Sequence, residues 1–310
     1  MNITVIGCGR WGSLITWYLD HIGHRVTLYG RAASPRMQAF LTTRQNDLLT
    51  LPESVALSTA LDAALESAET VIISIGSQSL RSLLGQSELQ ALRNRTVVLC
   101  MKGLEMGTGA RLSQIAAELL HPSNTVAVWL GPGHVQEFYR GIPNCMVIDS
   151  ENEDVKRRLV QSFSSDLIRF YYGGDMIGNE VGAAAKNVVG IAAGFLDGFE
   201  MSSLKGALMS RGTREVARLI KAMGGSELSA YGLCHLGDYE ATVFSPYSHN
   251  RQFGESFVRG QDYHQLAEGY YTVKALMLLG QRYGVELPIC KAVHDILYEQ
   301  AVPRDVLDRK

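Results

Sequence analysis

Lys186 is the residue whose setting most directly suggests acid–base chemistry. It stands in the stretch 179–199, which consists mainly of small and apolar residues and is predicted to form a helix. A lysine in such a helix should be partly buried, and burial disfavours its charged form, which brings its pKa toward the range useful for proton transfer. The alternative is a lysine whose stem follows the helix while its ammonium reaches solvent.

Lys102 and Asp238 could act together with Lys186. Lys102 opens the run KGLE (102–105) directly after a predicted strand at 96–100, and ligands of open α/β sheets gather outside the carboxyl ends of the strands. Asp238 lies in the turn-rich segment HLGD (235–238) and could orient Lys186. Taken alone, Lys102 could be a surface lysine and Asp238 a helix cap.

Gly7, Gly9 and Gly12 form the GxGxxG pattern of dinucleotide-binding turns. The pattern lies between a predicted strand at 3–6 and a predicted helix that runs toward residue 19, which is the setting that such a turn needs. A pyrophosphate at this helix start is stabilised by free N–H groups and by the positive end of the helix dipole. We therefore interpret the pattern as a nucleotide site rather than as a chance glycine cluster.

Arg31 follows the second predicted strand, 25–29, at the place where an NAD-selective enzyme commonly has Asp or Glu to bind the ribose 2′-hydroxyl. A guanidinium can instead pair with a 2′-phosphate in bidentate fashion. Arg31 thus favours NADPH as the cofactor, with NADH as the alternative. The other interpretation of Arg31 is an ordinary solvated surface residue.

The elements that must position these residues belong to two parts of the chain. In the first part, short apolar runs alternate with helical stretches, at 3–6, 25–29, 70–75, 96–100 and 126–129. This rhythm is typical of βαβ units and a parallel sheet. Two further strands, at 145–148 and 167–172, surround a charged helix at 151–162.

After the glycines at 173 and 174 no strand signal recurs, and helical periodicity dominates the rest of the chain. The small-residue segment 182–194 would permit a close approach of helices. We predict an α/β Rossmann-like dinucleotide-binding domain at residues 1–175. A helical substrate-binding and catalytic domain is predicted at residues 176–310.

Composition and charge exclude several functional classes. The 310 residues exceed the usual size of a single core, and the 46% of hydrophobic against 19% of charged residues suits a globular protein. The net charge of −2, from 29 basic and 31 acidic side chains, argues against nucleic acid as a partner.

The cysteines and the apolar runs add two further expectations. The five cysteines are widely spread and show neither a CxxC pair nor metal-like spacing with histidine, so reduced thiols and no metal site are expected. No apolar run reaches the roughly 18 residues of a membrane span, and the features of a secretory signal are missing. We therefore expect no membrane insertion and a cytoplasmic location.

Eight short segments, in this order, resemble the NAD(P)-dependent glycerol-3-phosphate dehydrogenases of the bacterial type. They are GCGRWG at 7–12, KGLE at 102–105, GP at 131–132, AKNV at 185–188, RG at 211–212, LGD at 236–238, NRQFG at 250–254 and EGY at 268–270. The ordered set is specific, although several segments are weak individually. The resemblance implies a Rossmann-like domain followed by an all-α domain like the C-terminal domain of 6-phosphogluconate dehydrogenase.

The same resemblance implies a role for individual residues. Lys186 would be the proton donor or acceptor at the C2 oxygen of a phosphorylated small-molecule substrate, with Lys102 and Asp238 as the other catalytic residues. The implied cofactor contacts are Gly7, Gly9, Arg10, Trp11, Gly12, Arg31, Lys102, Val135, His249 and Glu268. The implied substrate contacts are Lys102, Gly131, Gly133, Lys186, Asp238, Thr242, Ser248, His249, Asn250 and Arg251. The implied reaction is reduction of dihydroxyacetone phosphate to sn-glycerol 3-phosphate for glycerophospholipid synthesis.

Two departures from the family pattern lie on the substrate side. His249 stands where the family typically has an arginine, and Gly133 stands where it has a threonine. Histidine cannot form the bidentate fork of a guanidinium, and Arg251, two positions later, is a candidate replacement. These departures keep two alternatives open, which are a reductase of the same fold acting on a keto acid and a non-catalytic NADPH-binding regulatory protein. The family also makes a homodimer an option, although nothing in the sequence determines a stoichiometry.

Overall fold

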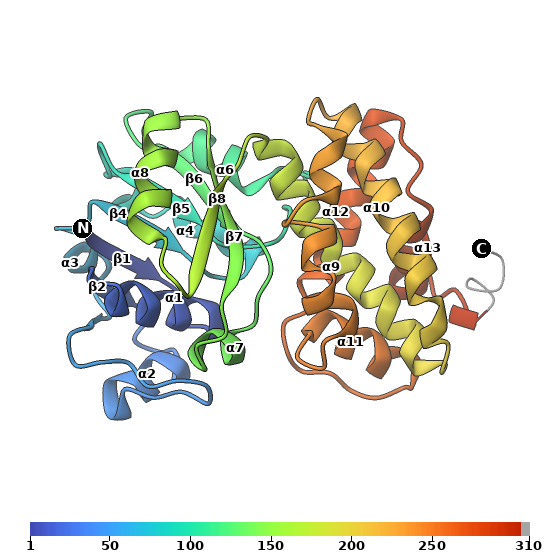
Figure 1. Cartoon of the computed structure of the whole chain (residues 1–310), viewed down its shortest axis with the longest axis horizontal. Helices are drawn as coiled ribbons and strands as arrows, with labels where there is room; N and C mark the ends of the chain where they lie inside the picture. Colours follow the sequence, from blue (N-terminus) through green and yellow to red (C-terminus); the bar gives the residue numbers. More distant parts are fainter. Residues whose placement is uncertain (305–310) are drawn as a thin grey trace. The chain divides into compact units, whose positions relative to one another are not determined.

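The computed structural model describes residues 1–304, which fall into two compact units (Figure 1). The N-terminal unit consists of residues 1–101, 113–129 and 133–174. The helical unit has its main stretch from Asp175 onward and also includes two loops from the first half of the chain, 102–112 and 130–132. Both loops therefore belong to the helical unit by their contacts, although they precede residue 176.

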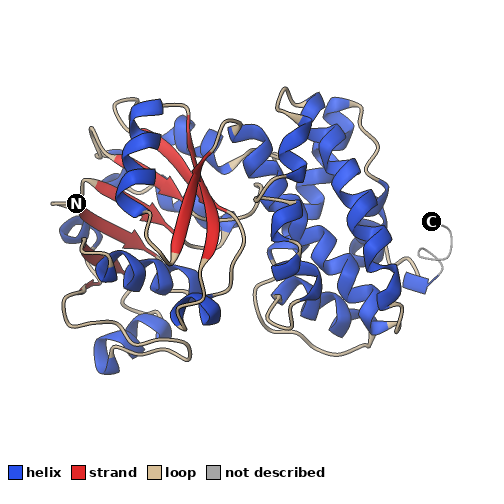
Figure 2. Ribbon diagram, viewed as in Figure 1, coloured by secondary structure: helices blue, strands red, loops and turns tan. Residues whose placement is uncertain are grey.

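An eight-stranded sheet runs through the N-terminal unit in the order β3-β2-β1-β4-β5-β6-β7-β8 (Figure 2). The strands are β1 (Asn2–Ile6), β2 (Arg25–Tyr29), β3 (Ala56–Ser58), β4 (Thr70–Ile73), β5 (Thr96–Leu99), β6 (Thr125–Leu130), β7 (Asn144–Ser150) and β8 (Ile168–Tyr172). Pairing is parallel between β1 and both of its neighbours, and also for β2–β3, β4–β5, β5–β6 and β7–β8. The predicted parallel, Rossmann-like sheet is confirmed.

All seven predicted strands are present, with ends that differ by at most two residues from the prediction. The strand β3 was not predicted, because a strand of three residues at the edge of the sheet is too short to show alternation. The strands β4 and β5 are buried at every position, which is the pattern of parallel strands that are covered on both faces.

Helices alternate with the strands of this unit. They are α1 (Arg10–His21), α2 (Pro35–Thr43), α3 (Leu61–Leu65), a 3-10 turn at Ser77–Ser79, α4 (Leu80–Leu84), α5 (Ser87–Gln90), α6 (Leu112–Leu119), α7 (Val135–Tyr139) and α8 (Glu153–Phe163). The strand order reverses at β1, which has β2 on one side and β4 on the other. Open α/β sheets bind ligands at such a point, outside the carboxyl ends of the strands.

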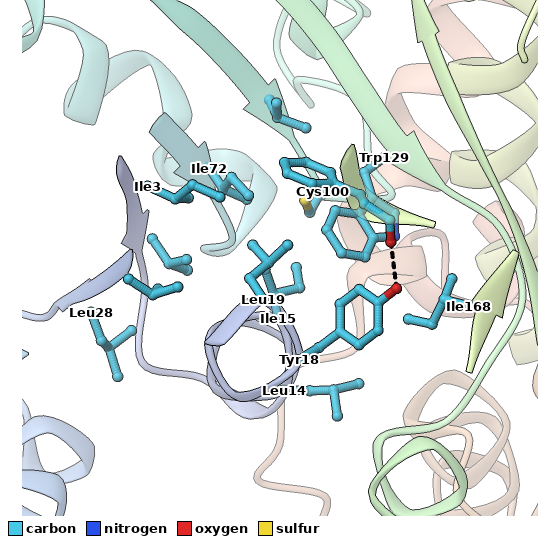
Figure 3. Close-up of a cluster of buried hydrophobic side chains, with 14 of the residues drawn as sticks. Ile3, Leu14, Ile15, Tyr18, Leu19, Leu28, Ile72, Cys100, Trp129 and Ile168 are labelled. Carbon is cyan, nitrogen blue, oxygen red and sulfur yellow. Dashed lines mark hydrogen bonds between the residues drawn. The ribbon is translucent and has the colours of Figure 1, made fainter. Parts of the chain in front are cut away.

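The core of the N-terminal unit forms where α1 packs against the sheet (Figure 3). Leu14, Ile15, Tyr18 and Leu19 are all buried, and their spacing places them on one face of the helix. The Tyr18 hydroxyl donates to the backbone carbonyl of Phe163, and burial raises the pKa of Tyr18 to about 12. This bond anchors α1 to the C-terminal end of α8.

The helical unit is built around α9 (Met176–Gly198), which is buried along most of its length. Around it pack α10 (Lys205–Ala222), α11 (His249–Val258), α12 (Glu268–Tyr283) and α13 (Pro288–Tyr298), and single turns lie at Ser202–Leu204, Glu227–Tyr231, Leu236–Asp238 and Glu240–Phe244. A side chain at Gly194 would collide with the backbone of α11, so the small residues of α9 do permit close helix contact, as predicted.

No strand follows Tyr172 within the residues that the structure describes, which confirms the all-α character predicted for the second half. Among these residues, no helix is both long enough and apolar enough to cross a membrane.

Candidate active site

Two amines share one buried carboxylate in the helical unit. The Oδ2 atom of Asp238 lies 2.7 Å from the Nζ atom of Lys102 and 2.9 Å from the Nζ atom of Lys186. Asp238 has no exposed surface, and Lys186 is only 6% exposed. Lys102, Lys186 and Asp238, which were predicted to be the catalytic residues, therefore lie together, and Asp238 is placed to orient Lys186.

Lys186 projects from the middle of α9, where its neighbours in the helix are buried alanines, valines and glycines. Burial is the largest influence on its pKa, which is lowered from 10.5 to about 8. The carboxylate of Asp238 acts against this shift, and the positive charge of Lys102 adds to it. Lys186 can therefore exchange a proton near neutral pH.

Lys102 is held by two bonds besides its ion pair with Asp238. Its Nζ atom donates to the backbone carbonyl of Gly131 at 2.5 Å, which ties together the two loops that the first half of the chain contributes to this unit. The carbonyl of Lys102 accepts from the side-chain amide of Asn187 at 2.7 Å. The loop is thus fixed to the helix turn that carries Lys186.

Asp238 and Thr242 lie on consecutive tight turns between α10 and α11. The Oγ1 atom of Thr242 accepts from Lys186 Nζ at 2.7 Å and donates to the carbonyl of Asp238 at 2.7 Å. Residues 240–244 form a single π-helical turn, a local geometry that is frequent at functional sites. The two turns together place the carboxylate of Asp238 and the hydroxyl of Thr242 on the same amine.

One oxygen of the shared carboxylate is unused within the part of the chain that the structure describes. Oδ1 of Asp238 is buried and has no hydrogen-bond partner among residues 1–304, whereas Oδ2 serves both amines. Buried carboxylate oxygens are nearly always hydrogen-bonded. Oδ1 can therefore accept a hydroxyl group of a bound ligand.

The glycine-rich turn in the N-terminal unit has the geometry that a pyrophosphate needs. Gly7 has a φ of 117°, and a side chain at Gly12 would collide with the carbonyl of Gly7. α1 begins at Arg10, and its N-cap, Gly9, provides no side-chain cap. The turn follows β1 and touches Ser74 after β4, so it lies at the point where the strand order reverses. Its residues fit a dinucleotide.

Arg31 and a residue that the sequence analysis missed, Arg36, lie next to this turn. Both arginines are exposed, and Nη1 of Arg36 is 3.7 Å from the place where a Cβ of Gly9 would stand. Ser34 caps α2 and lies 3.6 Å from the thiol of Cys8 inside the turn. A serine cap followed by proline at the first helical position was the signal that α2 begins here and presents Arg36.

Family models match both halves of the chain. The model described as NAD-dependent glycerol-3-phosphate dehydrogenase N-terminus matches residues 2–156, and the corresponding C-terminus model matches residues 175–308. The chain belongs to the NAD-dependent glycerol-3-phosphate dehydrogenase family. It is therefore an NAD(P)-dependent dehydrogenase by family, as the ordered motifs predicted.

Individual members of the family match along their whole length. Glycerol-3-phosphate dehydrogenase [NAD(P)+] of Nitrosomonas europaea is 36% identical, with 100% of this chain and 98% of that protein covered. The same enzyme of a Thermoanaerobacter strain is 32% identical, with 99% and 96% covered. The crystal structure of glycerol-3-phosphate dehydrogenase from Coxiella burnetii superposes with a TM-score of 0.91 at 26% identity, with 99% of this chain and 98% of that chain covered.

A ketopantoate reductase from Ralstonia eutropha also superposes, with a TM-score of 0.65 at 15% identity and coverage of 100% and 99%. At that identity the likeness extends to the fold alone.

The surroundings of Gly133 explain why this position holds a glycine in this chain. Gly133 lies in the N-terminal unit with a φ of 136°, a conformation that side chains rarely adopt, and a Cβ there would collide with the ring of Phe138. The ring of Phe138 thus fills the space that a threonine side chain would need. Val135 is the first residue of α7 and is buried, and Trp11 lies with its ring centroid 6.0 Å from that of Phe138.

The residues around the second departure are engaged within the helical unit. Ser248 caps α11 by accepting from the N–H of Arg251, and Nδ1 of His249 lies 2.6 Å from the hydroxyl of Tyr263. Arg251 donates from Nη1 to Asp197 at 2.9 Å and to Glu255 at 2.8 Å. Asp197 also pairs with Lys205 and Glu255 also pairs with Arg259, so these two carboxylates face three cations and leave a positive charge beside α11. Arg251 therefore stays a candidate phosphate ligand.

Asn250 connects three helices of the helical unit. Its amide donates to Oδ1 of Asn187 at 3.1 Å, and its own oxygen accepts from the N–H of Gly269 at 2.9 Å, directly after Glu268 at the start of α12. Asn187 in turn donates to the carbonyl of Lys102, so Asn250 is linked to Lys102 through Asn187. Asn187 belongs to the motif AKNV, but the sequence does not reveal that it links Asn250 to the loop of Lys102.

Proposed function

We propose that this chain is a glycerol-3-phosphate dehydrogenase that reduces dihydroxyacetone phosphate to sn-glycerol 3-phosphate, which supplies glycerophospholipid synthesis. The observation that carries the proposal is the pair of amines on Asp238, in a chain that matches the family along its whole length. Two protonated amines and one carboxylate leave a net positive charge, which suits an anionic substrate with a carbonyl group.

In the proposed reaction, Lys186 handles the proton. Reduction of a ketone places a negative charge on the carbonyl oxygen, which must then receive a proton. An ammonium with a pKa of about 8 is largely protonated at pH 7 and still releases its proton readily. In the reverse direction, the neutral amine would take the proton from the C2 hydroxyl group.

The other two residues of the cluster prepare this step. Lys102, held between Asp238 and the carbonyl of Gly131, would provide a fixed positive charge beside the developing alkoxide. Asp238 would orient both amines through Oδ2, while its unused Oδ1 would accept a substrate hydroxyl. Thr242 and Asn250 would keep this arrangement in place, as would Ser248 through its cap of α11.

A bound nicotinamide cofactor supplies the hydride. Gly7, Gly9 and Gly12 would hold its pyrophosphate at the start of α1, together with Arg10 and Trp11. Arg31 and Arg36 would bind a 2′-phosphate, so we propose a preference for NADPH over NADH. Val135, His249 and Glu268 are proposed as further cofactor contacts on the family likeness alone.

A substrate panel tests the proposal. Purified protein should reduce dihydroxyacetone phosphate with NADPH and should be far less active on ketopantoate and on 2-keto or 3-keto acids. A higher kcat/KM on a keto acid would replace the proposed substrate by that acid. Tight NADPH binding without turnover of any carbonyl compound would favour a non-catalytic regulatory protein. The departures from the family pattern at Gly133 and His249 are the reason for considering this alternative.

Two further properties are proposed on the family likeness and on composition. We expect a homodimer, which light scattering of the purified protein would distinguish from a monomer. We expect the protein in the cytoplasmic fraction of its cell, and recovery in a membrane or secreted fraction would contradict this.

A further inference from the structure

A buried histidine that the mechanism does not use lies beside the amine cluster. His235 has no exposed surface. Its Nδ1 atom is 2.8 Å from the carbonyl of Gly182, and its Nε2 atom is 2.7 Å from the hydroxyl of Tyr239. Because a carbonyl oxygen can only accept, Nδ1 carries the proton and Nε2 accepts from Tyr239.

Both ends of this hydrogen-bonded chain reach segments that carry catalytic groups. Gly182 precedes Lys186 by one turn of α9. On the other side, the carbonyl of His235 accepts from the N–H of Asp238 at 3.0 Å, and the carbonyl of Tyr239 accepts from the N–H of Thr242 at 3.1 Å. The imidazole thus connects the helix turn that presents the amine with the segment that presents its two partners.

The packing around the bridge leaves little room for movement. A Cβ at Gly182 would lie 3.0 Å from the Cβ of His235, and a Cβ at Gly212 would lie 3.2 Å from the hydroxyl of Tyr239. Gly182 therefore lets the side chain of His235 approach α9 closely, and Gly212 does the same for Tyr239 at α10. The rings of His235 and Tyr239 are 4.9 Å apart and nearly edge to face.

His235 stays neutral over the range in which Lys186 titrates. The pKa of His235 is lowered to about 4, chiefly by burial and in addition by the charge of Lys186, while the bond to the Gly182 carbonyl and the charge of Asp238 act in the opposite direction. Burial also raises the pKa of Tyr239, a hydrogen bond with Thr213 acts against this shift, and the charges of Cys290 on α13 and Glu215 on α10 add to it. The bridge therefore keeps one tautomer and does not compete for the proton of Lys186.

We propose that His235 and Tyr239 are positioning residues that hold the Asp238 carboxylate at a fixed distance from the Lys186 amine. The proposal rests on the proposed function of Lys186. Without the bridge, the segment 235–242 keeps its bonds to the two amines but loses its link to the backbone of α9 at Gly182. Since Asp238 is the group that opposes the loss of charge on Lys186, its retreat would make the amine release its proton at lower pH.

Three variants separate this role from a purely structural one. In His235→Asn, the amide can donate to Gly182 as Nδ1 does, whereas His235→Leu removes the donor at similar volume and Tyr239→Phe removes only the hydroxyl. We expect His235→Leu to lower kcat by about tenfold or more and Tyr239→Phe to lower it by a smaller factor, with KM for NADPH changed by less than about twofold in both. The basic limb of the kcat profile should move to lower pH in both variants. His235→Asn should recover kcat to within about threefold of wild type.

His24→Leu is the matched control. Burial lowers the pKa of His24 as it does that of His235, and the ring of His24 bonds the backbone carbonyl of Ser162 at 2.9 Å. His24 differs in that it lies in the N-terminal unit. His24→Leu should leave kcat and its pH profile unchanged. If His235→Leu and His235→Asn lose thermal stability equally and both keep the wild-type pH profile, the positioning role is refuted.

A readout without substrate keeps this test separate from the test of the proposed function. Carbamylation by cyanate requires the neutral amine, so its rate at Lys186 against pH, followed by peptide mass spectrometry, reports the titration of Lys186 directly. The midpoint should fall in His235→Leu and stay near wild type in His235→Asn and His24→Leu. An unchanged or raised midpoint in His235→Leu would overturn the proposal, even if the protein reduces dihydroxyacetone phosphate. A lowered midpoint would support it, even if another carbonyl compound is the substrate.

Discussion

At the scale of single residues, the proposed chemistry depends on one buried carboxylate that forms ion pairs with two amines. Asp238 bonds Lys102 and Lys186 through the same oxygen. Because burial is the larger influence on Lys186, its pKa settles at about 8, well below that of a free lysine. A residue in this state can give a proton to an alkoxide and take it back.

Lys186→Ala should lower kcat for dihydroxyacetone phosphate by about 10²- to 10⁴-fold, the usual contribution of a general acid, with a smaller effect on KM. Steady-state kinetics would measure this. Lys291→Ala is a control, because Lys291 is an exposed lysine paired with Asp295 on α13. Similar losses in both variants would contradict the proposed role.

The pH dependence should differ between the two directions of the reaction. The protonated amine is the active form for ketone reduction, so kcat should fall as the pH rises through about 8. The neutral amine is needed for alcohol oxidation, so that rate should rise through the same pH. For stability, the lowered pKa means that the folded state loses its proton before the unfolded state, so Lys186 destabilises the fold less as the pH rises above about 8.

Cofactor preference should depend on the two arginines beside the glycine-rich turn. Arg31→Ala and Arg36→Ala should each raise KM for NADPH by about tenfold, which corresponds to the loss of one charge-assisted contact, and should change KM for NADH little. Arg25→Ala, at the opposite end of β2, should change neither. Equal effects on both cofactors would exclude a 2′-phosphate role.

At the scale of elements, two short segments between helices and strands have unusual backbone conformations that position side chains of the site. The π-helical turn at 240–244 places Thr242 on Lys186, and the loop before α7 has a backbone at Gly133 that excludes a side chain. The ring of Phe138 occupies the space that a side chain at position 133 would need.

Gly133→Ala should destabilise the protein more than Gly224→Ala. Both positions have positive φ values, of 136° and 90°, and each should therefore cost about 1–2 kcal/mol of backbone strain. Only Gly133 would also drive a Cβ into Phe138, for about 1–3 kcal/mol more, because nothing lies within 4 Å of a Cβ at Gly224. Urea unfolding of the two variants would measure the difference, and equal losses would show that the loop can relax.

At the scale of the whole molecule, the helical unit is not a continuous piece of chain. It includes Lys102 and Arg111 from the first half, and Arg111 pairs at 2.6 Å with the buried carboxylate of Glu180 on α9. A fragment of residues 175–310 would leave both Asp238 and Glu180 without these partners. Removing one partner of a buried ion pair costs about 3–5 kcal/mol.

We therefore expect the fragment 175–310 to melt at a lower temperature than the full chain, or to remain unfolded. Circular dichroism during heating would test this. A fragment that melts as the full chain does would show that the two loops contribute no stability to the helical unit.

The sequence by itself determined the strands, the glycine-rich turn, the helical second half and the membership in a family. These features depend on patterns within a few consecutive residues, such as runs of β-branched side chains, glycine spacing and ordered motifs. The strand β3 could not be predicted, because three residues are too few to show the alternation of a strand.

Only the tertiary structure decided which side chains meet. Lys102 and Lys186 share one oxygen of Asp238, Arg251 pairs with Asp197, and His235 bonds the carbonyl of Gly182. Each of these contacts joins residues that are far apart in the chain. The direction of a side chain depends on how helices pack and on which charges are buried together, and neither quantity is contained in the spacing of residues along the sequence.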